Sequence, residues 1–145
     1  QFDELSSKIS KTKEQSKIVS ESFYLEGFIS KDMWKYLAAA DLVVARAGAT
    51  SNLELAALAK PTILVPNARL TGGHQMKNAQ VYKKSNAVEI VSDDEIENSP
   101  EILSNKILEL LDDSQKTSKM SQEFSNFAKP NAAKDVADMI LSFKK

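Results

Sequence analysis

Residues 40–66 read ADLVVARAGATSNLELAALAKPTILVP, and this stretch decides the fold. A short apolar run at 41–48 leads into small and hydroxyl residues, and a helix-forming segment at 50–60 follows, which Pro61 stops. The run at 62–66 is apolar again. Continuous apolar runs joined by a helix of crossover length are typical of a parallel sheet. The stretch therefore predicts an α/β protein.

The same alternation extends to both sides of this stretch. Upstream, residues 17–29 are rich in β-formers and predict extended chain, while Phe2, Leu5 and Ile9 lie at helical spacing. Downstream, residues 87–92 predict another buried strand. Helices are predicted at 30–41, 74–86, 99–112, 115–128 and 131–144, and polar loops at 67–73 and 92–100.

Length and composition exclude several classes of protein. A chain of 145 residues with 42% apolar and 27% charged residues fits one soluble globular domain, here over 1–145 with a helical extension at about 99–145. Its 19 basic residues balance its 20 acidic ones, which argues against nucleic-acid binding. Because it has no cysteine and one histidine, we expect no metal site. No apolar run approaches the roughly 20 residues that span a bilayer.

The junction that begins at Gly48 allows two interpretations. Glycine permits close approach, and the unpaired amides of Ala49, Thr50 and Ser51 at a helix start suit a phosphate. Glu54, one turn into the helix, can accept two hydrogen bonds from a ribose diol. The letters SNLE also fit a capping box, in which the glutamate bonds back to the N-cap backbone. On these residues alone, the capping box is the favoured interpretation.

A second junction, PNARLTGGHQMKNA at 66–79, follows the next strand. His74 and Gln75 stand at a helix start, where they could donate to sugar hydroxyls. Alternatively, His74 is a helix residue in solvent, and Asn78 is a buried side chain bonded to backbone. A lone histidine without a partner acid or nucleophile is weak evidence for catalysis. The acidic run from Asp93 to Glu97 is predicted to be a solvated loop.

Together, RAGATSNLE and HQMKNA resemble motifs of the MurG-type glycosyltransferases, because they occur in the family's order with a proline-bounded strand between them. Those enzymes are the UDP-N-acetylglucosamine:undecaprenyl-pyrophosphoryl-muramyl-pentapeptide N-acetylglucosaminyltransferases of peptidoglycan synthesis. The resemblance runs from about Phe28 to Ala87. It implies a Rossmann-like parallel sheet with flanking helices. The resemblance further implies that this sheet belongs to the C-terminal, donor-binding half of a GT-B glycosyltransferase, and we expect the chain to be a fragment that is incomplete at its N-terminus.

The resemblance also implies roles for particular residues. Those expected to bind the donor contact its uracil, diphosphate, ribose and N-acetylglucosamine in turn, and two further residues give structural support. They are Ile29 for the uracil; Gly48, Ala49, Thr50 and Ser51 for the diphosphate; Glu54 for the ribose; His74 and Gln75 for the sugar; and Arg46 and Asn78 as support. No catalytic residue is expected in this chain.

The implied reaction is an inverting transfer of N-acetylglucosamine from UDP to a lipid-linked muramyl-pentapeptide, without metal or cofactor. The resemblance places the full-length protein in the cytoplasm, peripheral on the inner face of the bacterial membrane. The acceptor would bind a missing N-terminal domain, and the chain alone would bind donor weakly and transfer no sugar. Two alternatives stay open: a GT-B transferase of the two-subunit dolichol-pathway type, and a non-catalytic α/β interaction module.

Overall fold

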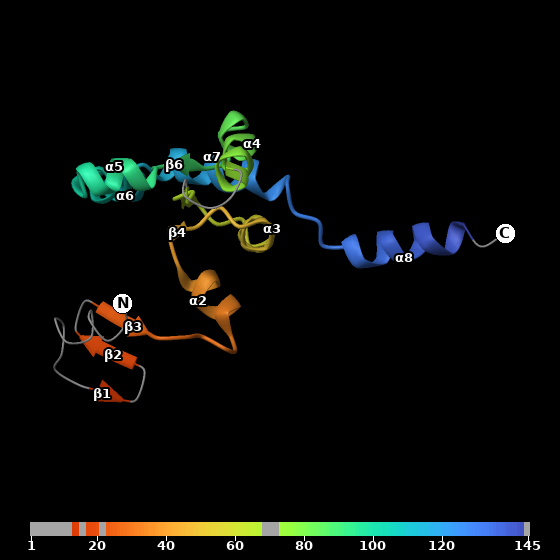
Figure 1. Ribbon diagram of the computed structural model, residues 1–145, viewed down its shortest axis with the longest axis horizontal. Coiled ribbons are helices and arrows are strands. Elements are labelled where there is room, and N and C mark those ends of the chain that lie inside the picture. Colours follow the sequence, from red (N-terminus) through yellow and green to blue (C-terminus); the bar gives the residue numbers. More distant parts are fainter. Residues whose placement is uncertain (1–12, 15–16, 21–22, 68–72, 144–145) are drawn as a thin grey trace. The chain divides into compact units, whose positions relative to one another are not determined.

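A computed structural model describes residues 13–14, 17–20, 23–67 and 73–143 of the chain (Figure 1). The chain divides into two compact units, one ending at Tyr36 and the other beginning at Leu37. Each unit is described by itself, and the single domain expected over 1–145 stays a prediction. Within the described residues, no helix combines the length and the apolar character needed to cross a bilayer.

The first unit contains a small antiparallel sheet. Its strands are β1 (Lys13–Glu14), β2 (Lys17–Ser20) and β3 (Phe23–Glu26), in the order β1-β2-β3. The extended chain predicted at 17–29 is therefore confirmed in part, but it is folded into a hairpin, which the β-forming composition did not predict. The helical spacing predicted for residues 2–9 lies outside the described residues.

The second unit is built on a parallel sheet, as predicted. Its strands β4 (Val43–Ala45), β5 (Thr62–Leu64) and β6 (Glu89–Ile90) lie in the order β4-β5-β6. All residues of the central strand β5 are buried. The strand β4 is less buried than β5, since Val44 is 41% exposed, and among the described strands it pairs only with β5.

Helices flank this sheet and join its strands. The described helices are α2 (Met33–Ala39), α3 (Ala49–Ala57), α4 (His74–Lys84), α5 (Asp93–Asn98), α6 (Glu101–Asp112), α7 (Ser114–Ser125) and α8 (Ala132–Ser142). The helix α3 connects β4 to β5, and α4 connects β5 to β6, which gives the crossover connections that a parallel sheet requires.

The core consists of two clusters, which the alternating side chains of β5 separate. Leu64 belongs to a cluster with residues of α3, α4 and α7, among them Leu55 and the fully buried Phe124. Ile63 belongs to the other cluster, with Leu110 of α6 and Met120 of α7. Because successive strand residues face opposite sides of a sheet, the helices cover both faces. This confirms the α/β fold with a parallel sheet and flanking helices.

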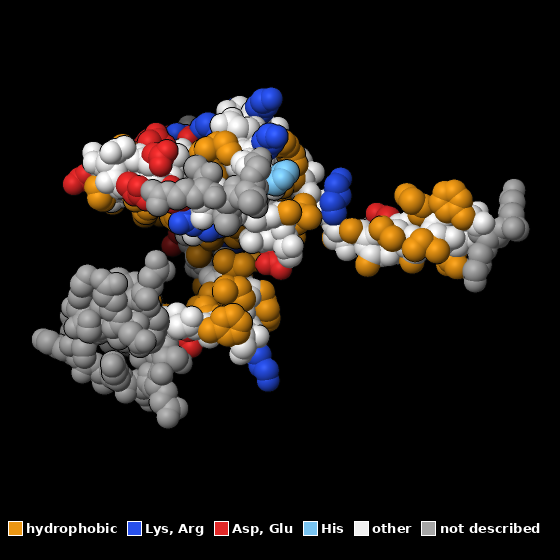
Figure 2. Space-filling model, in the orientation of Figure 1, with side chains coloured by type: hydrophobic (Ala, Val, Ile, Leu, Met, Phe, Trp, Pro, Cys, Tyr) orange, Lys and Arg blue, Asp and Glu red, His pale blue; other side chains and the backbone are white. Residues whose placement is uncertain are grey.

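Two helical segments differ from the expectation. The predicted loop at 92–100 contains α5, because Ser92 and Glu95 form a capping box that starts a helix in a polar segment. The helix α8, predicted at 131–144, has apolar side chains at helical spacing that are exposed: Met139 is 61% and Phe143, just after the helix, 80% exposed. Figure 2 shows apolar side chains along α8.

Candidate functional site

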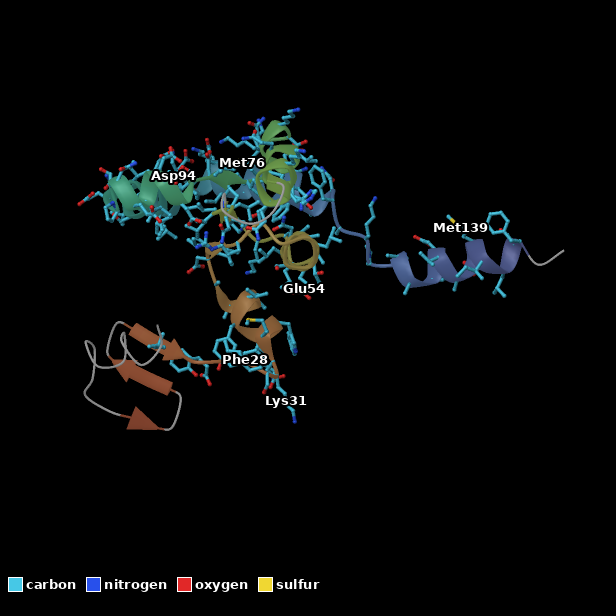
Figure 3. The ribbon with its side chains drawn as sticks, in the orientation of Figure 1. Phe28, Lys31, Glu54, Met76, Asp94 and Met139 are labelled. Carbon is cyan, nitrogen blue, oxygen red and sulfur yellow. The ribbon has the colours of Figure 1, made fainter. Side chains whose placement is uncertain are left out.

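The two junctions singled out in the sequence follow β4 and β5. Because parallel strands point the same way, their carboxyl ends share one edge of the sheet, where ligands of open α/β sheets bind. The helices α3 and α4 begin after these strand ends, and Figure 3 shows Glu54 on α3 and Met76 on α4. Both junctions therefore lie at the carboxyl ends of the strands, where the sequence interpretation expected them, and their role as a ligand site stays a prediction.

The first junction leaves helix amides open. Gly48 is the N-cap residue of α3, and no side chain caps the first turn of this helix. The first helical bond runs from the Asn52 amide to the Gly48 carbonyl, at 3.0 Å. No described group accepts a hydrogen bond from the amides of Ala49, Thr50 or Ser51, and these three residues are exposed. The helix start therefore presents free donors and the positive end of the helix dipole.

Space, and not special backbone angles, accounts for the glycine at position 48. Gly48 has φ −75° and ψ 139°, an extended conformation that any residue adopts. Space is the constraint instead, since an added Cβ would lie 3.1 Å from the Ser51 hydroxyl oxygen. A side chain at Gly48 would therefore crowd the Ser51 hydroxyl at the open end of the helix.

The capping box predicted for Ser51 and Glu54 is absent. The helix α3 already begins at Ala49, so Ser51 is the third helical residue and cannot act as its N-cap. The Glu54 side chain is exposed and has no hydrogen-bond or ion-pair partner among the described residues. The structural interpretation of Glu54, favoured on the residues alone, is therefore wrong, and its carboxylate is available to a ligand.

Asn52 is a residue that the sequence interpretation did not single out. It is fully buried on α3, and neither atom of its side-chain amide has a hydrogen-bond partner among the described residues. A buried amide without partners costs about 1–3 kcal/mol of stability. A polar residue on the apolar face of a predicted helix was the sequence signal for this position.

The second junction is held by Gln75. Its side-chain oxygen accepts a hydrogen bond of 2.9 Å from the Asn67 amide, which ties the chain after β5 to the first turn of α4. Gly73 caps this helix with φ 62°, a left-handed conformation that favours glycine. His74 is exposed at the helix start. Asn78 is partly buried, and its side chain has no hydrogen-bond partner among the described residues. The interpretation of Asn78 as a buried residue bonded to backbone is therefore wrong.

Arg46 joins the ends of neighbouring strands. Its Nη1 donates to the Val65 carbonyl at 3.3 Å and to Asp93 Oδ1 at 2.5 Å. The expectation of a solvated loop at Asp93 is therefore wrong for this residue. Ile29, predicted to contact the uracil, belongs to the first unit, whereas the other predicted site residues belong to the second.

A separate ion-pair cluster lies at the amino-terminal end of β6. Lys83 and Lys116 contact Glu89 at 2.5 and 3.3 Å. Although burial raises the pKa of Glu89, the two lysines lower it further than burial raises it. A cavity of about 270 Å³ opens beside them, lined also by Asn86, Lys119 and Met120. This cavity shares no lining residue with the two junctions.

Residues 4–137 match the model of the glycosyltransferase family 28 C-terminal domain, and the chain belongs to this family. The resemblance to MurG-type transferases, first drawn from the two linked motifs, is thereby confirmed. The matched region includes both junctions and every strand of the parallel sheet. Among the described residues, no three His, Cys, Asp or Glu side chains are grouped to hold a metal ion.

The similar proteins carry a more specific name. The chain is 40% identical over 117 residues to the UDP-N-acetylglucosamine–N-acetylmuramyl-(pentapeptide) pyrophosphoryl-undecaprenol N-acetylglucosamine transferase of Porphyromonas gingivalis, covering 81% of this chain and 30% of that protein. The enzyme of that name from Listeria monocytogenes is 37% identical over 114 residues, covering 79% and 31%. A crystal structure of Acinetobacter baumannii MurG matches with a TM-score of 0.69 and 31% identity, covering 80% and 32%. The chain thus spans about a third of the length of these relatives.

Proposed function

We propose that this chain is the donor-binding part of an inverting glycosyltransferase. In this proposal, the enzyme transfers N-acetylglucosamine from UDP to the lipid-linked muramyl-pentapeptide precursor of peptidoglycan. Family membership and the names of the similar proteins support the reaction class. The observation that carries the proposal is the uncapped start of α3, where free amides lie one turn from the unpartnered Glu54 carboxylate.

The free amides suit the diphosphate of the donor. The amides of Ala49, Thr50 and Ser51, with the hydroxyls of the latter two, donate to phosphate oxygens, and Gly48 leaves room for them. Negative charge grows on the departing UDP as the bond to the sugar breaks. A preorganised helix start stabilises that charge without a metal ion or cofactor.

The remaining contacts order the nucleoside and the sugar. Glu54 accepts hydrogen bonds from the two ribose hydroxyls. The sugar hydroxyls meet His74 and the side-chain amide nitrogen of Gln75, whose oxygen already holds Asn67. Arg46 and Asn78 support these turns. In this proposal, the donor is bound by the starts of two helices, α3 and α4, which follow the neighbouring strands β4 and β5.

The acceptor belongs to the part of the longer protein that this chain does not span. We propose that a partner N-terminal domain binds the lipid-linked acceptor, supplies the catalytic base, and holds the whole enzyme on the inner face of the bacterial membrane. The chain by itself is then expected to bind donor weakly and to transfer no sugar. Full transferase activity of these residues alone would contradict this division.

The proposal is tested by calorimetric titration of the chain with UDP, UDP-N-acetylglucosamine and GDP. We expect both uridine nucleotides to bind more tightly than GDP, and Glu54→Gln to weaken UDP binding about tenfold, or about 1.4 kcal/mol. The matched control is Glu101→Gln, another exposed glutamate near a helix start, which should leave binding unchanged. Equal binding of UDP and GDP, or equal loss in the two variants, would contradict the proposal.

A further inference from the structure

The Arg46 side chain connects the carboxyl ends of the described strands of the parallel sheet, β4, β5 and β6. It follows β4 directly, it donates to the carbonyl of Val65 after β5, and it pairs with Asp93, which begins α5 after β6. One guanidinium nitrogen makes both contacts, at 3.3 and 2.5 Å. A planar guanidinium with fixed donors is well suited to hold several acceptors in one arrangement.

This connection lies between the two junctions of the proposed donor site. Arg46 precedes Gly48 by two residues, and the Gly48 amide donates to the Arg46 carbonyl at 2.8 Å. Val65 precedes Asn67 by two residues, and Asn67 is in turn held by Gln75. A shift of the Arg46 side chain would therefore reach the turn of α3 on one side and the start of α4 on the other.

Asp93 is the anchor of this arrangement. Its side chain is 19% exposed, whereas the Arg46 side chain is 55% exposed, so the carboxylate is the more enclosed partner. A hydrogen bond between two charged groups is about twice as strong as one between neutral groups. Its neighbour Asp94 is exposed and has no hydrogen-bond or ion-pair partner among the described residues (Figure 3). The two adjacent aspartates thus differ in contacts while sharing charge and helix.

We infer that Asp93 is a positioning residue of the donor site. It holds the Arg46 guanidinium against the strand ends, and this contact fixes the turn that presents the free amides of Ala49, Thr50 and Ser51. Asp93 touches neither donor nor acceptor, and it acts through Arg46. The inference rests on the proposed function, because the turn it positions is the proposed diphosphate site.

The test compares Asp93→Asn with the matched control Asp94→Asn in the same chain. We expect Asp93→Asn to speed hydrogen exchange of the Gly48 and Asn52 amides, which are hydrogen-bonded on either side of the turn, and to raise the UDP dissociation constant about fivefold. Asp94→Asn should change neither. When Arg46→Gln is already present, adding Asp93→Asn should not weaken UDP binding further, because Asp93 acts through the Arg46 guanidinium. Melting temperature is recorded for every variant, since a merely structural residue would lower it without changing exchange at Gly48 and Asn52.

The outcomes separate the two proposals. Unchanged exchange at Gly48 and Asn52 and unchanged UDP affinity in Asp93→Asn would overturn the inference, whatever happens to the melting temperature. Equal effects of Asp93→Asn and Asp94→Asn would also overturn it, because they would reflect net charge. If the unmodified chain binds no UDP, the proposed function fails, and the exchange measurement still decides whether Asp93 orders the turn.

Discussion

The sequence pattern S-x-x-E occurs at the starts of two helices, and it has different outcomes there. At Ser92 the hydroxyl accepts from the Glu95 amide at 3.2 Å, and the Glu95 carboxylate accepts from the Ser92 amide at 2.7 Å. At Ser51 no such box forms, because α3 begins earlier, after Gly48. One helix start is satisfied by its own side chains, and the other leaves its amides and a glutamate free. The difference teaches that this pattern forms a capping box only where its serine is the N-cap residue of the helix.

Removing one free amide from α3 should have the largest effect on ligand binding. Ala49→Pro keeps the helix, since proline is favoured at the first helical position and Gly48 already has the extended conformation that must precede it. We expect UDP affinity to fall about tenfold, or about 1.4 kcal/mol, with stability unchanged or slightly raised. Calorimetry with uridine, which lacks phosphates, is the control. An equal loss for uridine and UDP would show that the amide does not serve the diphosphate.

Truncating the two serines should separate the two helix starts. Ser92→Ala removes a cap and is expected to lower the free energy of unfolding by about 1 kcal/mol without changing UDP binding. Ser51→Ala removes no cap, so we expect a stability change of less than about 0.5 kcal/mol and weaker UDP binding. Denaturant unfolding and calorimetry on both variants measure this. Equal losses of stability in Ser92→Ala and Ser51→Ala would contradict the claim that only Ser92 caps a helix.

Acid should weaken the capped helix start, and the expected effect on stability is smaller than that of Ser92→Ala. Hydrogen bonds from the Ser92 backbone and hydroxyl lower the pKa of Glu95, and hydrogen bonds from Lys106 and Lys116 lower the pKa of Glu109 to about 2. A carboxylate with a lowered folded pKa stabilises the fold above its unfolded pKa, and this stability is lost as pH falls through the folded value. Stability should therefore decline below about pH 4.5. Thermal melts should show a shallower decline in Glu95→Gln, and an unchanged slope would contradict the role of this cap.

Much of the fold could be predicted from local sequence. The run TILVP gave β5 because a continuous apolar run fits a strand buried on both faces. The helix α5 was missed because its segment is polar and short, although Ser92 and Glu95 carried the signal. The hairpin of β2 and β3 was missed because β-forming composition does not locate a turn.

The candidate site was predictable in position but less so in contacts. The residues at the two strand ends were found from motif order and from the topology of parallel sheets. Whether Ser51 caps a helix depends on where that helix begins, and this is set by Gly48 three residues earlier. The pairing of Arg46 with Asp93 joins residues 47 positions apart, so it depends on the packing of three strand ends. Nothing local to either residue predicts it.

The central claim is that Glu54 is free to bind ribose and does not cap a helix. The most direct test measures UDP and 2′-deoxy-UDP affinities for the unmodified chain and for Glu54→Gln. We predict that the unmodified chain prefers UDP by about tenfold, and that this preference largely disappears in Glu54→Gln while stability is unchanged. An equal preference in both proteins, or a stability loss of about 1 kcal/mol without any change in preference, would contradict the account.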